Sequence, residues 1–281
     1  MGSGPAVRLS WYNSASFRSK KLYHKVLAID MINPILQSSR VMRVCESIVN
    51  AVFPRSCVGC GLSRKNGGNY LCGLCRDDIF VIDDPLCNTC GIPADIDYDY
   101  PAEGFECGWC RKGGFRFDQA RSLGLYDSVL KELIHFYKYR NQPGVMSEIE
   151  PYLRDYFETC RDEYQGYVVT SVPLHVKKLK ERGFDQSFVL AHKIAEILDL
   201  PLLTRPIRRM RETLSQARKN RAERFQNVRG AFEVVSLDTV FEKKILLVDD
   251  VFTTGSTVNE VARVLKKAKV ERVQVFTLAR A

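Results

Sequence analysis

The chain has 281 residues, 45% hydrophobic and 27% charged, which is typical of a folded, soluble protein rather than a disordered one. Its longest aliphatic run, Ile245 to Val248, is far shorter than the roughly 18 residues of a membrane-spanning helix, so we expect no membrane insertion. The net charge of +9 is uneven, with +6 over residues 1–45, −6 over 46–110 and +9 over 111–281, so the C-terminal part suits anionic ligands without selecting one of them.

Residues 1–40 are rich in Ser, Lys and Arg and show no sustained hydrophobic periodicity. Three interpretations fit this segment: a basic tail, an organelle-targeting leader, or a start codon assigned too early, with Met31 and Met42 downstream. We expect a cytoplasmic protein, with targeting by residues 1–40 left open. The following residues, 41–56, carry apolar side chains at helical spacing from about Val41 to Phe53. They predict an amphipathic helix that packs on the protein body and ends before Pro54.

Eight of the ten cysteines form four C-x-x-C pairs within residues 57–110. Each such pair can point two sulfurs at one metal ion, and two pairs complete a tetrahedral site. No secretory signal precedes them, which favours zinc over disulfides, with an iron–sulfur cluster as the further alternative. We therefore predict a small double zinc ribbon with two closed structural Zn²⁺ sites. Consecutive ligation is expected and interleaved ligation stays open; the expected sets are Cys57, Cys60, Cys72 and Cys75, then Cys87, Cys90, Cys107 and Cys110.

Residues 111–281 have the pattern of an α/β domain. Helical periodicity covers residues 127–140, 186–198 and 257–268, and residues 151–160 are expected to form part of another helix. Buried-type strands are predicted over 167–172, 244–248 and 273–278. This alternation predicts a mostly parallel sheet with helices on both faces.

A candidate phosphate-binding loop follows the strand over 244–248. Two adjacent carboxylates, Asp249 and Asp250, lead into a short loop of hydroxyls and glycine that opens a helix. Backbone N–H groups and hydroxyls at a helix N-terminus suit a phosphate, and the carboxylates suit the hydroxyls of a sugar. The sequence therefore predicts a sugar-phosphate site; its loop residues are Thr253, Thr254, Gly255, Ser256 and Thr257.

This run resembles the 5-phosphoribosyl-1-pyrophosphate (PRPP) signature of type I phosphoribosyltransferases. With four cysteine pairs ahead of it, the chain resembles the ComF/GntX family of competence-associated phosphoribosyltransferase-like proteins from about residue 41 onward. The family more often has Asn at the position of Asp185. Further matching positions are Phe117, Asp118, Tyr126, Lys138, Tyr139, Val172 to Leu174, Arg182 to Gln186, Arg211, Thr213, Gln216, Arg221, Asn227 and Leu278 to Arg280.

The resemblance implies a role for each part of the site. Asp249 and Asp250 would bind the ribose hydroxyls, and Thr253 to Thr257 the 5′-phosphate. The turn after Val172 would face pyrophosphate, and residues 205–229 would include a mobile flap. Cations proposed for these two regions are Lys177, Lys178, Arg182, Arg211 and Arg221, whereas His175 is expected to be a surface or a capping histidine rather than a catalytic one.

Two functions from different classes remain. As an enzyme, the protein would bind Mg²⁺–PRPP and transfer phosphoribose to an unknown acceptor, with the zinc segment serving as the hood that recognises this acceptor. As an adaptor, it would sense PRPP without turnover and bind single-stranded DNA or a helicase-like competence partner. Only one aromatic residue, Phe225, lies within 205–229, which weakens a base-stacking role for that segment.

Overall fold

The computed structural model describes residues 56–63, 70–94, 105–140, 142–213 and 220–281. The chain divides into two units, residues 1–55 and 56–281, and the fold described below is that of the second unit. The predictions for residues 1–55 lie outside the described residues.

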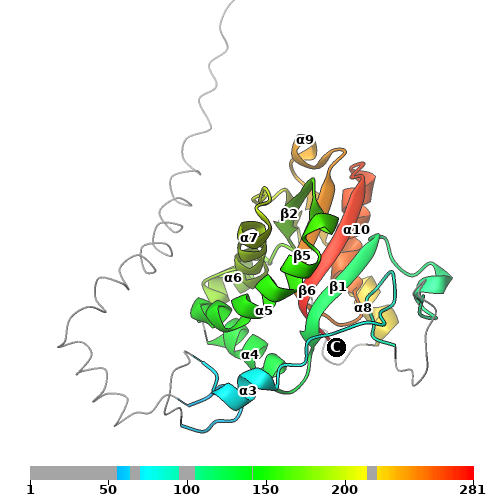
Figure 1. Cartoon of the computed structure of the whole chain (residues 1–281). Coiled ribbons are helices and arrows are strands. Elements are labelled where there is room, and N and C mark those ends of the chain that lie inside the picture. The colour runs from blue at the N-terminus through cyan, green and yellow to red at the C-terminus, as the bar shows by residue number, and fades with distance from the viewer. Residues whose placement is uncertain (1–55, 64–69, 95–104, 141, 214–219) are drawn as a thin grey trace, which may run out of the picture. The chain divides into compact units, whose positions relative to one another are not determined.

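A four-stranded parallel sheet forms the centre of this unit, with the strand order β1-β6-β5-β2 (Figure 1). The strands are β1 (Gln119–Leu125), β2 (Tyr167–Ser171), β5 (Lys244–Phe252) and β6 (Arg272–Arg280). The parallel sheet predicted for residues 111–281 is confirmed. Strand β1 was not predicted, because its sequence QARSLGL mixes polar and apolar residues without a clear alternation.

The C-terminal part of β5 corrects the predicted strand end. The sequence predicted an end at Val248, since acidic residues are depleted in strands. Instead, β5 continues through Asp249 and Asp250 to Phe252, because its backbone stays paired with β6 as far as Phe252 opposite Arg280. The two carboxylates therefore project from a strand whose backbone is held by hydrogen bonds.

Helices cover both faces of the sheet, as predicted. Helices α4 (Ser128–Tyr139), α5 (Met146–Thr159) and α7 (Gln186–Leu198) pack on one face, and α10 (Ser256–Lys267) packs on the other (Figure 1). Strand β5 serves both cores, because Leu246 and Val248 belong to the first and Ile245 and Leu247 to the second. The predicted bounds of α4 and α10 agree to within one residue, and those of α7 agree fully.

Helix α5 begins at Met146, five residues before the predicted start, so Pro151 lies inside the helix rather than at its first turn. The remaining elements are short. They are α3 (Gly73–Asp77), α6 (Val176–Arg182), α8 (Arg221–Val228), α9 (Leu237–Val240), the antiparallel pair β3 (Ile207–Arg209) and β4 (Phe232–Val234), and 3-10 turns at Cys110–Lys112, Pro143–Val145 and Arg161–Tyr164.

The cysteine-rich segment lies along the outer edge of β1. The Ile82 amide donates to the Leu123 carbonyl at 2.9 Å, and the Leu125 amide donates to the Phe80 carbonyl at 3.2 Å. Farther along, the Ala120 amide donates to the Thr89 carbonyl at 2.7 Å. The segment is therefore joined to the sheet through the backbone.

A buried carboxylate on α5 anchors the first half of the cysteine-rich segment. Glu148 is 4% exposed and accepts hydrogen bonds from the amides of Tyr70 at 2.7 Å and Leu71 at 3.4 Å, and from Arg76 at 2.8 Å. Burial alone would raise the pKa of Glu148, but the hydrogen bond from Arg76 and those from the two amides lower it. Glu148 is thus held ionised at the junction.

Replacing Glu148 with Ala is expected to lower the free energy of unfolding by about 1–3 kcal/mol, because the backbone amides of Tyr70 and Leu71 lose their hydrogen-bond acceptor. Glu148→Gln retains one acceptor oxygen and should cost less. Urea denaturation of both variants at pH 7.5 tests this. Equal losses in the two variants would contradict the role of the acceptor oxygens.

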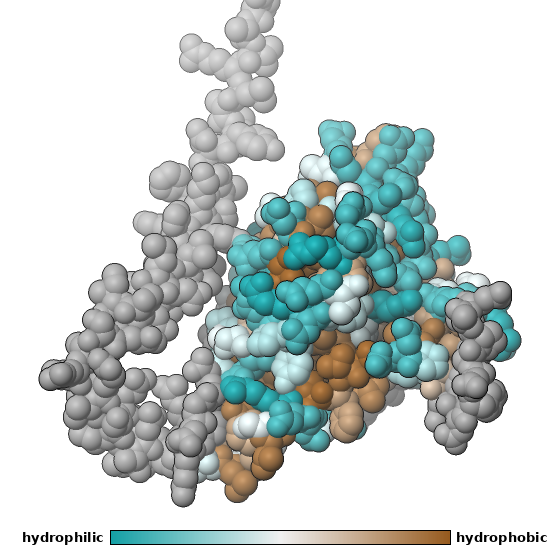
Figure 2. Space-filling model, viewed as in Figure 1, coloured by the Kyte–Doolittle hydropathy of each residue, from teal (hydrophilic) through white to brown (hydrophobic). Residues whose placement is uncertain are grey.

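Apolar side chains remain exposed near α3. Leu62 and Leu74 are 70% and 83% exposed, and Phe80 is 60% exposed. Figure 2 shows hydrophobic residues at the lower end of the viewed face, where α3 lies in Figure 1. Among the described residues, no helix has the length and apolar character needed to cross a bilayer.

Candidate functional site

The eight paired cysteines form two clusters of four. In each cluster the four sulfurs lie within 4.8 Å of one another, and each cluster joins two consecutive C-x-x-C pairs. Across the pairs, Cys60 Sγ and Cys72 Sγ are 3.9 Å apart, and Cys90 Sγ and Cys107 Sγ are 3.7 Å apart. Tetrahedral zinc with Zn–S bonds of about 2.3 Å requires sulfurs about 3.8 Å apart. The predicted consecutive grouping is confirmed, and both clusters fit Zn²⁺.

Backbone amides support the sulfurs. The Cys72 amide points at Cys57 Sγ and the Cys107 amide at Cys87 Sγ, both at 3.3 Å. Such N–H groups stabilise a thiolate, which is the form that binds metal. With four sulfurs around each position, neither cluster leaves a place for a substrate, so both are structural sites.

Asp249 and Asp250, near the end of β5, have different partners. Asp249 accepts a hydrogen bond from the Ser187 hydroxyl at 2.8 Å and one from the Asp250 amide at 2.9 Å. Asp250 forms an ion pair with Lys138 of α4, at 3.0 Å, and both of these side chains are at least 84% buried. Helices α4 and α7 thus hold the two carboxylates apart.

The two carboxylates also differ in their electrostatics. Burial raises the pKa of Asp249 to about 7, and the neighbouring Asp250 carboxylate adds to this rise. Burial alone would lower the pKa of Lys138, but its attraction to Asp250 raises it. At neutral pH the site therefore contains one carboxylate paired with a lysine and one that is poised to gain or lose a proton.

The loop after β5 leads into α10 through Gly255, which has φ +74°. A Cβ atom here would lie 2.4 Å from Phe252 Cζ and 2.8 Å from Phe115 Cε1. Only glycine therefore fits this turn, for both backbone and steric reasons. Thr254 and Thr257 are half-buried, Thr253 is exposed, and Ser256 is buried. The N-terminal amides of α10 lie beside these hydroxyls, in the arrangement that suits an anion.

Gly255→Ala is expected to destabilise the protein and to distort this loop, whereas Gly113→Ala provides a matched control. Gly113 also has a left-handed backbone, with φ +72°, but no atom lies within 4 Å of its Cβ position. The control should lose about 1–2 kcal/mol from backbone strain alone, and Gly255→Ala should lose more because of its clashes with Phe252 and Phe115. Thermal unfolding measures both losses, and equal losses would rule out the steric contribution.

The five predicted cations do not converge on one point. Lys178 and Arg182 of α6 line a cavity of about 180 Å³, together with Lys138, Tyr139 and Glu181. Lys177 instead lies 3.3 Å from the Glu212 carboxylate. Arg211 donates to the Arg229 carbonyl at 2.7 Å, and Arg221 lies 3.5 Å from the Thr254 carbonyl. Of the two roles expected for His175, surface or capping, the structure shows capping of α6, because its Nδ1 accepts from the Lys177 amide at 3.4 Å.

Several residues at the site were not assigned a role from the sequence. Asp185 caps α7 by accepting from the Phe188 amide with one carboxylate oxygen, and its other oxygen accepts from the Leu174 amide in the turn after β2. Arg209 Nε and Gln186 Nε2 are buried without a hydrogen-bond partner among the described residues. Burial lowers the pKa of Arg209, although the Asp249 carboxylate opposes this effect. A buried donor without a partner that faces the charge of Asp249, as Arg209 Nε does, suits a ligand rich in oxygen atoms.

The second zinc cluster reaches the candidate phosphate loop through aromatic side chains. The Arg221 guanidinium lies over the Trp109 ring, 3.9 Å from its centroid. Trp109 also contacts Phe115 and Phe225, at centroid distances of 6.3 and 6.1 Å, and Phe115 forms one wall of Gly255. The knuckle around Cys110, helix α8 and the loop at Gly255 thus share one aromatic cluster. The sequence did not predict this aromatic cluster, because Trp109 and Phe225 are more than 100 residues apart in the chain.

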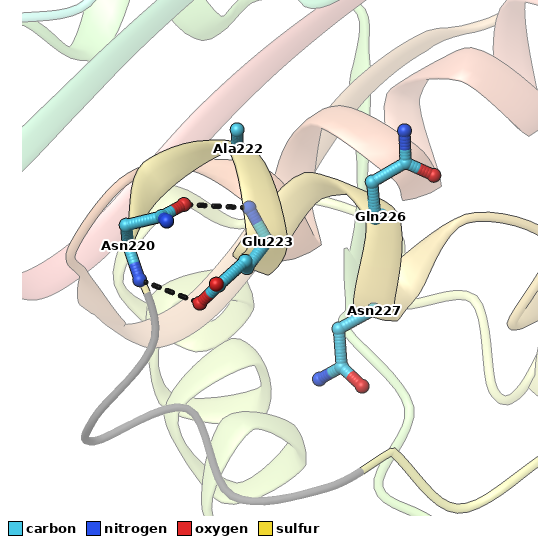
Figure 3. Close-up of a pocket in the computed structure, with 5 residues that line it drawn as sticks. All are labelled: Asn220, Ala222, Glu223, Gln226 and Asn227. Atoms are coloured by element: carbon cyan, nitrogen blue, oxygen red, sulfur yellow. Dashed lines mark hydrogen bonds between the residues drawn. The ribbon is translucent and has the colours of Figure 1, made fainter.

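An open hollow of about 630 Å³ lies beside α8 and its N-cap residue Asn220 (Figure 3). Asn220 and Glu223 form reciprocal capping hydrogen bonds at the start of the helix, at 2.9 and 3.0 Å. These bonds stabilise the first turn. The lining is formed by Asn220, Ala222, Glu223, Gln226 and Asn227, all within the segment 205–229 that was predicted to include a mobile flap.

Comparisons with known proteins agree with both parts of the fold. The double zinc ribbon domain family matches residues 48–112, and the phosphoribosyl transferase domain family matches residues 185–281. Competence protein F of Haemophilus influenzae is 31% identical over 236 residues, covering 82% of this chain and 98% of that protein. Competence protein ComFC of Bacillus subtilis is 29% identical over 224 residues, covering 75% and 84%. DNA utilization protein YhgH of Escherichia coli is 27% identical over 230 residues, covering 81% and 97%. The chain therefore belongs to the ComF family, and it carries a double zinc ribbon followed by a phosphoribosyltransferase domain.

Proposed function

We propose that this protein binds Mg²⁺–PRPP at the end of β5 and transfers the phosphoribosyl group to an acceptor, with release of pyrophosphate. The observation that carries this proposal is the position of Asp249 and Asp250 immediately before a glycine turn that opens α10. A cytoplasmic location fits it, since zinc–thiolate sites persist in a reducing compartment.

Each part of the site has a proposed task. Loop residues 253–257 and the first amides of α10 bind the 5′-phosphate, and the carboxylates of Asp249 and Asp250 accept hydrogen bonds from the ribose hydroxyls. Mg²⁺ held by the oxygens of PRPP would supply positive charge that stabilises the departing pyrophosphate. These contacts fix the ribose so that its C1 faces the acceptor.

The pyrophosphate side is proposed to involve the cavity beside α6. Lys178, Arg182 and Lys138 contribute its cationic lining, and the unpartnered Nε of Arg209 offers a further donor. In the reaction, the bond between ribose C1 and the pyrophosphate oxygen breaks, and pyrophosphate leaves with the electron pair. A lone pair of the acceptor forms the new bond to C1. Positive charge at the leaving group and correct positioning account for most of the catalysis.

The second zinc knuckle is proposed to form the hood over the acceptor. Trp109 is 39% exposed and shares an aromatic cluster with Phe115, which borders the phosphate loop. A rigid zinc knuckle would hold these rings at a fixed distance from the ribose.

Calorimetric titration of the zinc-loaded protein with Mg²⁺–PRPP tests the binding step. We expect micromolar affinity that is lost in the Asp249→Asn/Asp250→Asn double variant and unchanged in a Lys244→Met control, because Lys244 pairs with Glu271 at the start of β5, the opposite end of the strand from the two carboxylates. Pyrophosphate release in the presence of candidate acceptors then tests turnover. Absence of binding in a folded, zinc-replete sample would exclude both the transferase and the PRPP sensor.

A second proposed function is that of an adaptor that binds PRPP without turnover and also contacts single-stranded DNA or a helicase-like competence partner. It is supported by the names of the relatives, which refer to competence and DNA utilization, and by the positive net charge of the chain. Direct DNA binding should weaken steeply as salt rises. A flat salt response would favour a protein partner.

A further inference from the structure

A buried arginine lies against the second zinc cluster. Arg280, near the end of β6, is 8% exposed. Its Nη1 donates to the Cys90 carbonyl, and its Nη2 lies 3.5 Å from Cys90 Sγ. No carboxylate among the described residues lies within ion-pair distance of this guanidinium. An unpaired buried charge is costly, so its retention needs a compensating negative charge.

The sulfur cluster supplies that charge. Four thiolates around one Zn²⁺ leave a net charge of about −2. The Arg280 charge interacts with Cys90 first and also with Cys107 and Cys87. We infer that Arg280 is an outer-sphere component of the second zinc site, where its permanent positive charge offsets the charge of the zinc–thiolate complex and slows loss of the metal.

The first cluster differs in its exposure, which explains why, within the ranges that the structure describes, an unpaired arginine lies against the second cluster and none against the first. In the first cluster Cys60 is exposed and Cys72 is half-buried, so water can screen their charge. In the second cluster Cys87, Cys90 and Cys110 are all buried. Arg76, which directly follows Cys75 of the first cluster, is paired with Glu148 instead. The two sites of one molecule therefore provide an internal comparison.

The side chain of Arg280 also packs on an aromatic ring, and the test must separate packing from charge. Its guanidinium lies 4.5 Å from the Phe252 ring centroid. Arg280→Met keeps an unbranched side chain over Phe252 and removes the charge, whereas Arg280→Lys keeps the charge. Arg121→Met is the matched control, because Arg121 contacts the carbonyls of Cys87 and Asn88, at 3.4 and 3.2 Å, rather than a sulfur.

The experiment follows the release of zinc from each site separately. The zinc-loaded full chain is incubated with a chelator and pulsed with N-ethylmaleimide, and tryptic peptides are quantified by mass spectrometry. Cleavage at Arg and Lys places the first site on peptides 56–64 and 66–76 and the second site on peptide 77–111. The labelling of each peptide therefore reports one site, independently of any enzymatic activity.

Arg280→Met is expected to accelerate labelling of peptide 77–111 by about 10- to 100-fold, the usual effect of losing an outer-sphere partner, with little change in the other two peptides. Arg280→Lys should stay close to the wild type, and so should Arg121→Met. The inference is overturned if Arg280→Met leaves peptide 77–111 unchanged or accelerates all three peptides equally. It is also overturned if Arg280→Lys or Arg121→Met accelerates release as much as Arg280→Met. Should the Met variant not fold, rapid release from Arg280→Lys would by itself contradict the inference, and wild-type retention would support it.

Discussion

Asn in place of Asp249 is expected to stabilise the free protein above pH 7, whereas Asn in place of Asp250 is expected to destabilise it. In the unfolded chain the pKa of Asp249 is about 3.9, and in the folded protein burial and Asp250 raise it to about 7. The folded state therefore binds the proton more tightly, and the free energy of unfolding falls as the pH rises from about 4 to about 7. Asp249→Asn has no ionisable side chain at this position, so this pH-dependent fall in the free energy of unfolding is absent from the variant. Thermal unfolding at pH 5 and pH 8 should show a larger gain for Asp249→Asn at pH 8.

Asp250→Asn has the opposite effect on the free energy of unfolding, because it leaves the buried Lys138 without its partner. Removing one member of a buried ion pair costs about 3–5 kcal/mol. Adding Lys138→Met to Asp250→Asn should recover most of this stability. Equal melting temperatures for the two single Asn variants would contradict the different environments that we assign to the carboxylates.

Both Asn variants are expected to bind PRPP more weakly. A hydrogen bond to a charged group contributes about 1.5–3 kcal/mol, so each loss corresponds to about a 10- to 150-fold increase in Kd. For Asp249→Asn, higher stability would then accompany weaker binding. A variant that is stabilised and still binds with wild-type affinity would show that Asp249 does not contact the ligand.

Removal of zinc is expected to have the largest effect on stability. Binding of zinc to a structural site contributes about 10–16 kcal/mol, and the cysteine-rich segment has few other means to remain folded. Its loss should extend beyond the ribbon, because Cys57, Leu71 and Ile79 share a core with α4, α5 and the central sheet. Metal analysis should find two zinc ions per chain, and thermal unfolding with a strong chelator under reducing conditions should show a large fall in Tm.

The control for zinc removal is the same chelator saturated with ZnCl₂, which should leave the melting temperature unchanged. A metal content clearly below two per chain, or an unchanged melting temperature after complete removal, would contradict the structural role of both clusters.

The sequence predicted the features that depend on short-range pattern. The cysteine pairs, the apolar periodicity of α7 and the strand–loop–helix run from Lys244 to Lys267 all carry their information within about 25 residues. The features that it did not predict come from contacts between distant residues. Examples are the ion pair of Lys138 with Asp250 and the contact of Arg221 with Trp109.

The ends of strands are also set by contacts between distant residues, which local sequence does not predict. Asp249 and Asp250 have low strand propensity, yet pairing with β6 extends β5 past them. The five predicted cations were chosen by charge and position along the chain, and the fold separates them into different neighbourhoods. Which basic side chains share a cavity depends on the packing of α4 against α6, which no local pattern encodes.

The position of the zinc ribbon along β1 has a consequence for solubility. An edge strand exposes free N–H and C=O groups that can pair with another chain. In this protein the carbonyls of Phe80 and Thr89 accept from β1 on its outer side, and Ile82 donates to it. On the opposite edge, Pro201 and Leu203 pair with Val169 of β2. The cysteine-rich segment thus covers an edge strand that could otherwise pair with another chain. We expect that loss of zinc exposes the backbone N–H and C=O groups of β1, so that the protein becomes prone to aggregation as well as less stable.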